Sequence, residues 1–170
     1  LPFCLSSLVK QSIPLHEVIV VDDRSSDQTY KIAQSFQDFL PLTVVKRKSG
    51  MKGRVSMKSQ RHWDEITEVF NHGLKSSDFK FDYLAKIDAD FKVERRYFEK
   101  IVYAFQSNTK LGITGGMTIN EPGVVGVRGG NRVFRRKCWD EISNCGFMPL
   151  ICPEDMYLSL KASYEGWEII

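Results

Sequence analysis

Short apolar runs that end in aspartates alternate with amphipathic segments along this chain, and this alternation constrains the fold most. Residues 17–21 form a β-branched run that leads into Asp22 and Asp23. Residues 27–39 follow with apolar side chains at helical spacing, and residues 42–45 form a second apolar run. Strands that are covered on both faces show such continuous apolar runs. The order predicts a right-handed strand–helix–strand unit in an α/β fold.

The same alternation continues along the rest of the chain. The pattern predicts strands at residues 83–87, 111–118 and 167–170, and helices at residues 63–74, 95–105, 136–143 and 153–164. Residues 46–61 depart from it, because they carry seven Lys or Arg side chains and no acid. We interpret this basic segment as a solvated loop, and its charge could also attract a diphosphate, an anionic lipid surface or nucleic acid.

Composition narrows the class of protein. A chain of 170 residues with 42% hydrophobic residues is expected to form one domain with a packed core. No apolar run is long enough to span a membrane, and no signal peptide is visible. The cysteines show no CxxC pair, so neither a zinc site nor a disulfide framework is expected, and reduced cytoplasmic thiols are the simplest interpretation. The basic segment lacks interleaved aromatic residues, which argues against nucleic acid.

Aspartates stand where two of the predicted strands end. Asp22 and Asp23 follow the first strand, and Asp88 and Asp90 follow the strand at residues 83–87. Ligands of open α/β sheets bind at the carboxyl ends of the strands. Carboxylates gathered at one edge repel each other unless a cation compensates, and hard oxygen ligands select Mg²⁺ or Mn²⁺. The sequence therefore suggests a metal-bound diphosphate, with simple turn and capping aspartates as the alternative.

Two later segments carry further candidate residues. Glu154 and Asp155 open a predicted helix, where acids stabilise the positive end of the helix dipole or supply a general base for an acceptor hydroxyl. Residues 128–136 combine glycines with arginines. Glycine permits a close backbone approach, and Arg forks suit phosphate or polar acceptor groups. A solvated turn with surface arginines is the alternative for this segment.

Taken in this order, the motifs resemble the family 2 glycosyltransferases of the GT-A fold. The resemblance covers nearly the whole chain, and its matching segments are Leu5–Ser12, Val18–Asp27 with a DD-x-S-x-D turn, Asn71–Leu74, Lys86–Asp90, Gly130–Arg136, Glu154–Leu158 and Gly166–Ile169. It implies a three-layer α/β/α sandwich with a mostly parallel central sheet, and a single catalytic domain over residues 1–170. The family's opening strand and C-terminal part are missing from the match, so we expect a chain truncated at both ends.

The resemblance also implies roles for matching positions. These roles are donor contact for Asp22, Asp23 and Asp88, metal binding for Asp90 and Asp88, catalysis by Asp155 with Glu154 in support, and acceptor binding for Gly130, Arg135 and Arg136. The implied reaction is inverting, metal-dependent transfer of the hexosyltransferase type, from a nucleotide-diphosphate sugar to a hydroxyl acceptor. Mn²⁺ or Mg²⁺ is the implied cofactor. Polysaccharide, lipid-linked and protein acceptors all stay open.

Some features depart from the family pattern or leave alternatives. Phe70 precedes Asn71 where the family often has Arg, which leaves the donor base and sugar open. A sugar-phosphate nucleotidyltransferase is one alternative, although it would need a glycine-rich phosphate loop near the N-terminus. A non-catalytic nucleotide-binding domain is another, and the presence of both Asp90 and Asp155 argues against it. The expected location is the cytoplasm, or the cytoplasmic face of a membrane.

Overall fold

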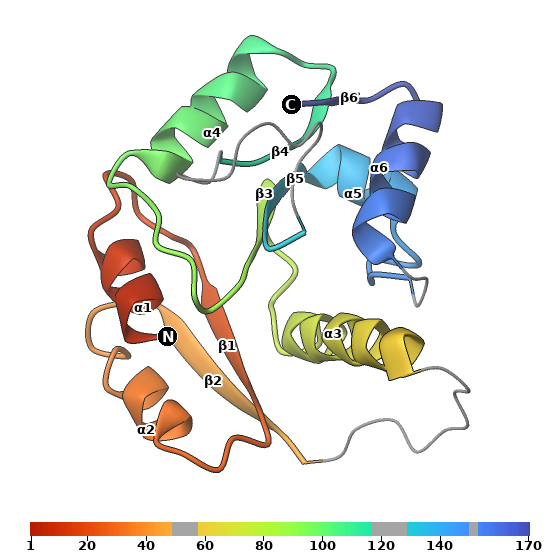
Figure 1. The fold of residues 1–170 in the computed structure, drawn as a ribbon. Coiled ribbons are helices and arrows are strands. Elements are labelled where there is room, and N and C mark those ends of the chain that lie inside the picture. Colours follow the sequence, from red (N-terminus) through yellow and green to blue (C-terminus); the bar gives the residue numbers. More distant parts are fainter. Residues whose placement is uncertain (49–57, 117–128, 150–152) are drawn as a thin grey trace.

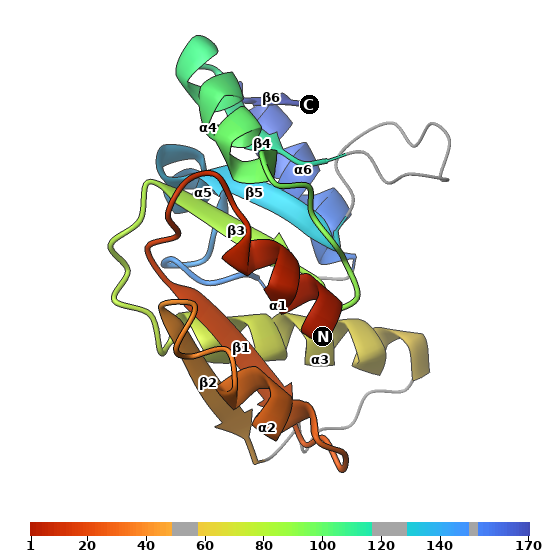
Figure 2. The same cartoon turned by 90° about the vertical axis from the view of Figure 1, so that its left-hand side faces the viewer.

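Strands separate two layers of helices in this protein (Figure 1). The computed structural model describes residues 1–48, 58–116, 129–149 and 153–170, with the backbone alone for residues 58–64. One layer contains helices α1 (Pro2–Val9), α2 (Thr29–Gln34) and α4 (Tyr97–Ser107), and the other contains α3 (Lys58–Leu74), α5 (Arg136–Ile142) and α6 (Glu154–Tyr164). Figure 2 looks onto the first of these layers. The arrangement confirms the predicted α/β/α fold.

The strands form two sheets in the described part of the chain. Strand β1 (Val18–Asp23) pairs in parallel with β2 (Leu42–Arg47), and α2 connects them, as the apolar pattern predicted. The second sheet has the order β3-β5-β4-β6. Its strands are β3 (Tyr83–Ile87), β4 (Leu111–Thr114), β5 (Asn131–Arg135) and β6 (Glu168–Ile169).

Strand β5 is a finding that the sequence did not predict. It lies between β3 and β4 and runs antiparallel to both, whereas β4 and β6 are parallel. The expectation of a mostly parallel sheet therefore needs this refinement. The apolar signal of β5 is only the pair Val133 and Phe134, because its other positions are Asn and Arg.

Each face of the strands is covered by its own hydrophobic core. The first core joins α1 and α4 to β2, β4 and β5, and includes Leu5, Leu42, Ile101, Phe105 and Val133. The second joins α3, α5 and α6 to β4 and β5, and includes Leu74, Ile113, Phe134, Trp139 and Leu158. Adjacent residues of β5 therefore enter opposite cores, since successive side chains of a strand point to opposite faces.

Several element boundaries differ from the prediction. Helix α2 ends at Gln34, well before residue 39, and α3 begins at Lys58 rather than at Trp63. The basic segment is thus not one loop: Lys46 and Arg47 end β2, and residues 58–61 are helical, since Lys, Arg and Gln are good helix formers. Residues 49–57 lie outside the described residues, as do residues 117–118 of the strand predicted at 111–118 and Arg128 of the glycine and arginine segment. No helix in the described ranges is long and apolar enough to cross a membrane.

Candidate active site

Both aspartate clusters lie at the carboxyl ends of strands. Strand β1 ends with Asp22 and Asp23, and Asp88 to Asp90 directly follow β3. Asp22 is buried, and its Oδ1 accepts the backbone N–H of Ser25 at 3.1 Å, which is the hydrogen bond of an Asx turn. Asp88 and Asp90 are exposed. The turn after β3 therefore presents its carboxylates to solvent, as a ligand site requires.

A pair of glycines lies between this turn and the start of α6. The carbonyl of Gly130 accepts the backbone N–H of Asp88 at 2.9 Å. A Cβ atom on Gly130 would lie 2.5 Å from Oδ2 of Asp88, and one on Gly129 would lie 3.1 Å from Oδ2 of Asp155. The carboxylates of Asp88 and Asp155 thus lie against adjacent residues, Gly130 and Gly129, which we call the glycine turn. The structure brings together three segments that the sequence singled out separately.

Lys86 is a residue of β3, and its ammonium group binds both the glycine pair and the turn after β3. This residue is buried, and its Nζ donates to the carbonyl of Gly129 at 2.7 Å and to Oδ1 of Asp88 at 3.3 Å. A buried ammonium group needs such partners, because burial of an unpaired charge costs several kcal/mol, on the order of 5. Lys86 therefore holds both the glycine turn and the Asp88 carboxylate, and motif reasoning had not marked it as a site residue.

The start of α6 contains a buried acid beside a half-buried one. Glu154 is only 3% exposed, and its Oε2 has no hydrogen-bond partner among the described residues. Burial raises the pKa of its carboxyl, and the positive charge of Lys86 acts in the opposite direction. Asp155 is half-buried, and its Oδ1 accepts the backbone N–H of Met156 at 2.8 Å. Asp155 is thus the more accessible of the two acids, and it faces the glycine turn.

The two arginines of β5, Arg132 and Arg135, lie on opposite faces of the strand, because successive side chains alternate between the faces. Arg132 is buried on the side of α6, and its guanidinium donates to the backbone carbonyl of Asp155 at 2.8 Å. Burial lowers the pKa of Arg132, while the charge of Asp155 counteracts the effect. Arg132 therefore binds the backbone of Asp155, the candidate base. Strand periodicity could have identified it, had β5 been recognised as a strand.

Arg135 is the last residue of β5, and Arg136 is the first residue of α5. Arg135 donates from Nε to the carbonyl of Leu111 at 2.7 Å and from a terminal nitrogen to that of Asn108 at 2.9 Å. Arg136 pairs with Asp140 at 2.8 Å. Both side chains thus hold neighbouring backbone or helix at the strand end remote from Gly130. Their acceptor-binding role stays a prediction, because these partners show what holds the two side chains and not what they bind.

Asp23 is held by two arginines. Arg47 on β2 donates from Nε to Oδ1 of Asp23 at 2.8 Å, and from Nη1 to Oε2 of Glu68 on α3 at 2.7 Å. Arg24 also binds Asp23, at 3.0 Å, with its backbone in the left-handed region at a φ of 62°. Partial burial opposes ionisation of Asp23, but the hydrogen bonds from Arg47 and Arg24 outweigh it and lower the pKa. This network links β1, β2 and α3 at the edge where donor contact was predicted.

Replacing Arg47 with Met should lower the free energy of unfolding by about 1–3 kcal/mol, because the charge-assisted hydrogen bonds of a guanidinium that is 5% exposed are lost. Urea unfolding measures the change. The lowered pKa of Asp23 stabilises the fold above the ordinary pKa of an aspartate, and this contribution disappears as the pH falls through the folded-state value. The deficit of the variant should therefore shrink at acidic pH.

The matched control is Arg96→Met, which removes an exposed Arg–Glu pair on α4. Exposed pairs contribute at most about 1 kcal/mol, so this change should cost far less. Equal losses in the two variants would contradict a stabilising role for the Arg47 network.

The carboxylates after β3 fit a hard divalent cation. Mg²⁺ and Mn²⁺ accept one or two carboxylates and complete their shell with water and substrate phosphates. Asp90 is exposed, and Asp88 keeps oxygen lone pairs beyond its bond to Lys86. No group of three or more His, Cys, Asp or Glu side chains with metal-binding geometry occurs within the described ranges. A cation here would therefore share its shell between Asp90, Asp88 and a bound diphosphate.

Comparisons with known proteins identify the family and the fold. A family model described as "Glycosyl transferase family 2" matches residues 1–145. A search of curated proteins found no match. Among solved structures, Staphylococcus aureus TarS 1-349 in complex with UDP is similar at a TM-score of 0.68 and 19% identity, with 94% of this chain and 49% of that chain covered.

A second solved structure is similar to the same degree. The mannosyltransferase PcManGT from Pyrobaculum calidifontis, in complex with GDP-Man and Mn²⁺, has a TM-score of 0.69 and 17% identity, with 96% of this chain and 48% of that chain covered. This chain therefore spans about half the length of either structure. At such identities the likeness shows a shared fold.

Proposed function

Glycosyl transferase family 2 is the family to which this chain belongs, and we propose that it transfers a sugar from a nucleotide-diphosphate donor to a hydroxyl acceptor with inversion at the anomeric carbon. One observation carries the proposal. The glycine turn at residues 129–130 contacts Asp88 on one side and Asp155 on the other, so a candidate donor-side carboxylate and a candidate base share one turn.

The reaction we propose is a single displacement. The acceptor oxygen attacks C1 of the sugar, the bond from C1 to the diphosphate oxygen breaks, and the nucleoside diphosphate leaves with the bonding electrons. Asp155 takes the proton of the acceptor hydroxyl, because it is the more accessible acid beside the glycine turn. Arg132 donates a hydrogen bond to the backbone carbonyl of Asp155 and so holds the start of α6 beside the glycine turn.

The donor side is assigned to the ends of β1 and β3. Asp22 and Asp23 would contact the nucleoside, with Arg47 and Arg24 holding Asp23 in place. Asp88 and Asp90 would hold Mn²⁺ or Mg²⁺, and such a cation would stabilise the negative charge of the departing diphosphate. Neighbouring structures were solved with UDP, with UDP-GlcNAc or with GDP-Man and Mn²⁺, which supports this class of donor.

Asp90→Ala tests the metal part of the proposal. Carboxylates at the donor site repel a diphosphate unless a cation lies between them. We therefore expect UDP or GDP to bind the native protein much more tightly with Mn²⁺ than with EDTA. Calorimetry should show that the variant loses about 10- to 100-fold in Mn²⁺-dependent affinity.

The control for this experiment is Asp38→Ala, which removes an exposed carboxylate from the turn after α2. It changes the net charge by the same amount and should leave nucleotide binding unchanged. Nucleotide binding that ignores Mn²⁺ and is the same in Asp90→Ala would overturn the metal site.

The acceptor class stays open, and the location at or near a cytoplasmic membrane surface stays a prediction. Gly130 is the predicted acceptor residue that lies at the site, and we propose Arg132 in place of Arg135 and Arg136 as the arginine that serves it.

A further inference from the structure

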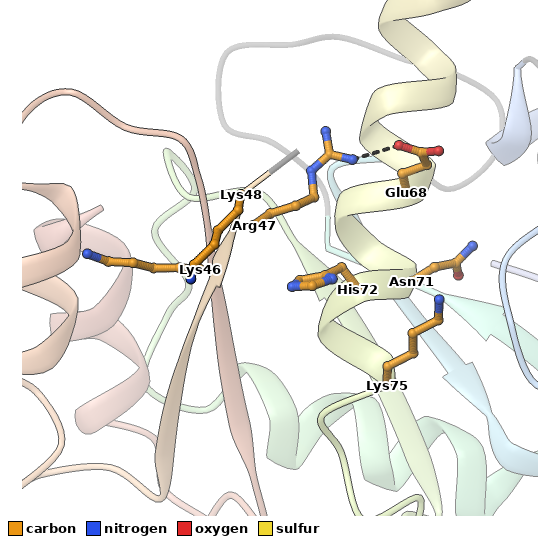
Figure 3. Close-up of a pocket in the computed structure, with 7 residues that line it drawn as sticks. All are labelled: Lys46, Arg47, Lys48, Glu68, Asn71, His72 and Lys75. Carbon is orange, nitrogen blue, oxygen red and sulfur yellow. Dashed lines mark hydrogen bonds and ion pairs between the residues drawn. The ribbon is translucent and has the colours of Figure 1, made fainter. Parts of the chain in front are cut away.

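A basic cavity of about 530 Å³ lies between the end of β2 and one face of α3 (Figure 3). Its lining consists of Lys46, Arg47, Lys48, Glu68, Asn71, His72 and Lys75. None of the carboxylates after β3 or at the start of α6 lines it. The cavity is therefore distinct from the glycine turn, although Arg47 connects it to Asp23.

The charges of the lining are unbalanced. Among the described residues it contains four Lys or Arg side chains and one carboxylate, which gives these residues a formal excess of three positive charges. Arg47 is neutralised by Asp23 and Glu68, and Nζ of Lys46 lies 3.6 Å from the ring centre of Tyr30. Lys48 and Lys75 are exposed and form no ion pair within the described part of the chain. These two lysines leave the cavity with uncompensated positive charge.

A buried nitrogen atom in the same cavity also lacks a partner. Nε2 of His72 is shielded from solvent and has no hydrogen-bond partner among the residues that the structure describes. The imidazole points from α3 towards β2, whereas the side chain of Lys75, one turn further along the helix, turns towards Asn71 (Figure 3). Buried polar atoms in folded proteins are almost always hydrogen-bonded. An oxygen acceptor from a ligand would satisfy this nitrogen.

We propose that this cavity is a second binding site, which takes the phosphoryl group of an anionic ligand. Lys48 and Lys75 supply the attractive charge, and His72 donates a hydrogen bond to a phosphoryl oxygen. The volume lies within the usual range of small-molecule sites and leaves room for a polar body beyond the phosphate. The site does not depend on the proposed metal site, because Lys48, Lys75 and His72 have no part in the proposed donor or metal binding and the site needs no divalent cation.

The experiment measures binding of inorganic phosphate and glycerol 3-phosphate by calorimetry in EDTA, where metal-dependent nucleotide binding is absent. The test variant is Lys48→Gln with Lys75→Gln, and its matched control is Lys10→Gln with Lys110→Gln, which removes two exposed lysines elsewhere. We expect the test variant to bind about tenfold more weakly and the control to bind as the native protein does. His72→Phe should weaken binding as well.

A second arm separates a soluble phosphoryl ligand from a lipid headgroup. It compares co-sedimentation with vesicles of phosphatidylglycerol and of phosphatidylcholine. Binding to the anionic vesicles alone, lost in the test variant and kept in the control, would assign the site to a headgroup. Equal losses of binding in the test and control variants would overturn the proposal. The absence of binding in both arms would overturn it as well, and Lys75 would then have the simpler role of stabilising the end of α3. Asp90→Ala should retain this binding, so the two proposals fail independently.

Discussion

Asp155→Asn is expected to abolish sugar transfer while leaving donor binding intact. The amide keeps the size of the side chain but cannot accept the proton of the acceptor hydroxyl. Removal of a positioned general base lowers turnover by about 100- to 10,000-fold. The measurement is kcat for transfer to an acceptor, together with the dissociation constant of the donor in the presence of Mn²⁺. A fall in kcat at constant donor affinity would assign Asp155 to the chemical step.

Glu154→Gln separates the two acids at the start of α6. Glu154 is buried and Asp155 is half-buried, so only the second is placed to meet an acceptor. We expect a smaller loss of turnover in Glu154→Gln, with a measurable change in stability because the group is buried. Glu165→Gln, an exposed acid at the other end of α6, serves as the neutral control. Native turnover by Asp155→Asn, or a larger defect in Glu154→Gln, would reassign the base.

Gly130→Ala should impair donor and metal binding, although it changes no charged group. Its Cβ would lie 2.5 Å from Oδ2 of Asp88 and 3.0 Å from Cε2 of Phe91. Carbon and oxygen atoms do not approach so closely, so the Asp88 carboxylate must move. Small displacements of positioning groups can cost about 100-fold in rate. Calorimetry with UDP or GDP and Mn²⁺, followed by steady-state kinetics, should show weaker donor binding and slower transfer.

Gly129→Ala provides the paired contrast. Its Cβ would lie 3.1 Å from Oδ2 of Asp155, so the crowding falls on the candidate base and should lower kcat more than donor affinity. Gly166→Ala is the control for stability alone: this residue has a φ of +86° and no heavy atom within 4 Å of the added methyl group. It should reduce stability without a specific loss of activity. If Gly130→Ala bound the donor normally, the assignment of Asp88 to the donor side would be wrong.

Periodicity alone was enough for much of the architecture. The apolar runs before Asp22 and Asp88 are strands, and the amphipathic segments between them are helices, as predicted. These elements are recognisable because side-chain alternation is local: each residue's environment follows from its neighbours a few positions away. Strand β5 was not predicted, because prediction from periodicity needs a regular local alternation of polar and apolar residues. Its alternation places Arg132 and Phe134 on one face and Val133 and Arg135 on the other, so polar and apolar residues occur on both.

The motif residues were recognised, but their contacts were not. Arg135 and Arg136 attracted attention as a pair of cations, and the structure commits them to backbone carbonyls and to Asp140. Lys86, Arg132 and Arg47 lie within segments that the sequence marked, but the motifs assigned none of the three a role of its own. Each is buried, and burial of a cation is possible only where the fold brings acceptors to it.

The sequence by itself determined the alternation of strands and helices, the identity of the carboxylates at the strand ends and the family to which they belong. Only the tertiary structure decided which of these residues meet. Lys86 and Gly129 are 43 positions apart, and Arg47 and Asp23 are 24 apart, yet each pair shares a hydrogen bond. Contacts over such separations depend on the packing of the two cores, which no local pattern encodes. They place the glycine turn between Asp88 and Asp155.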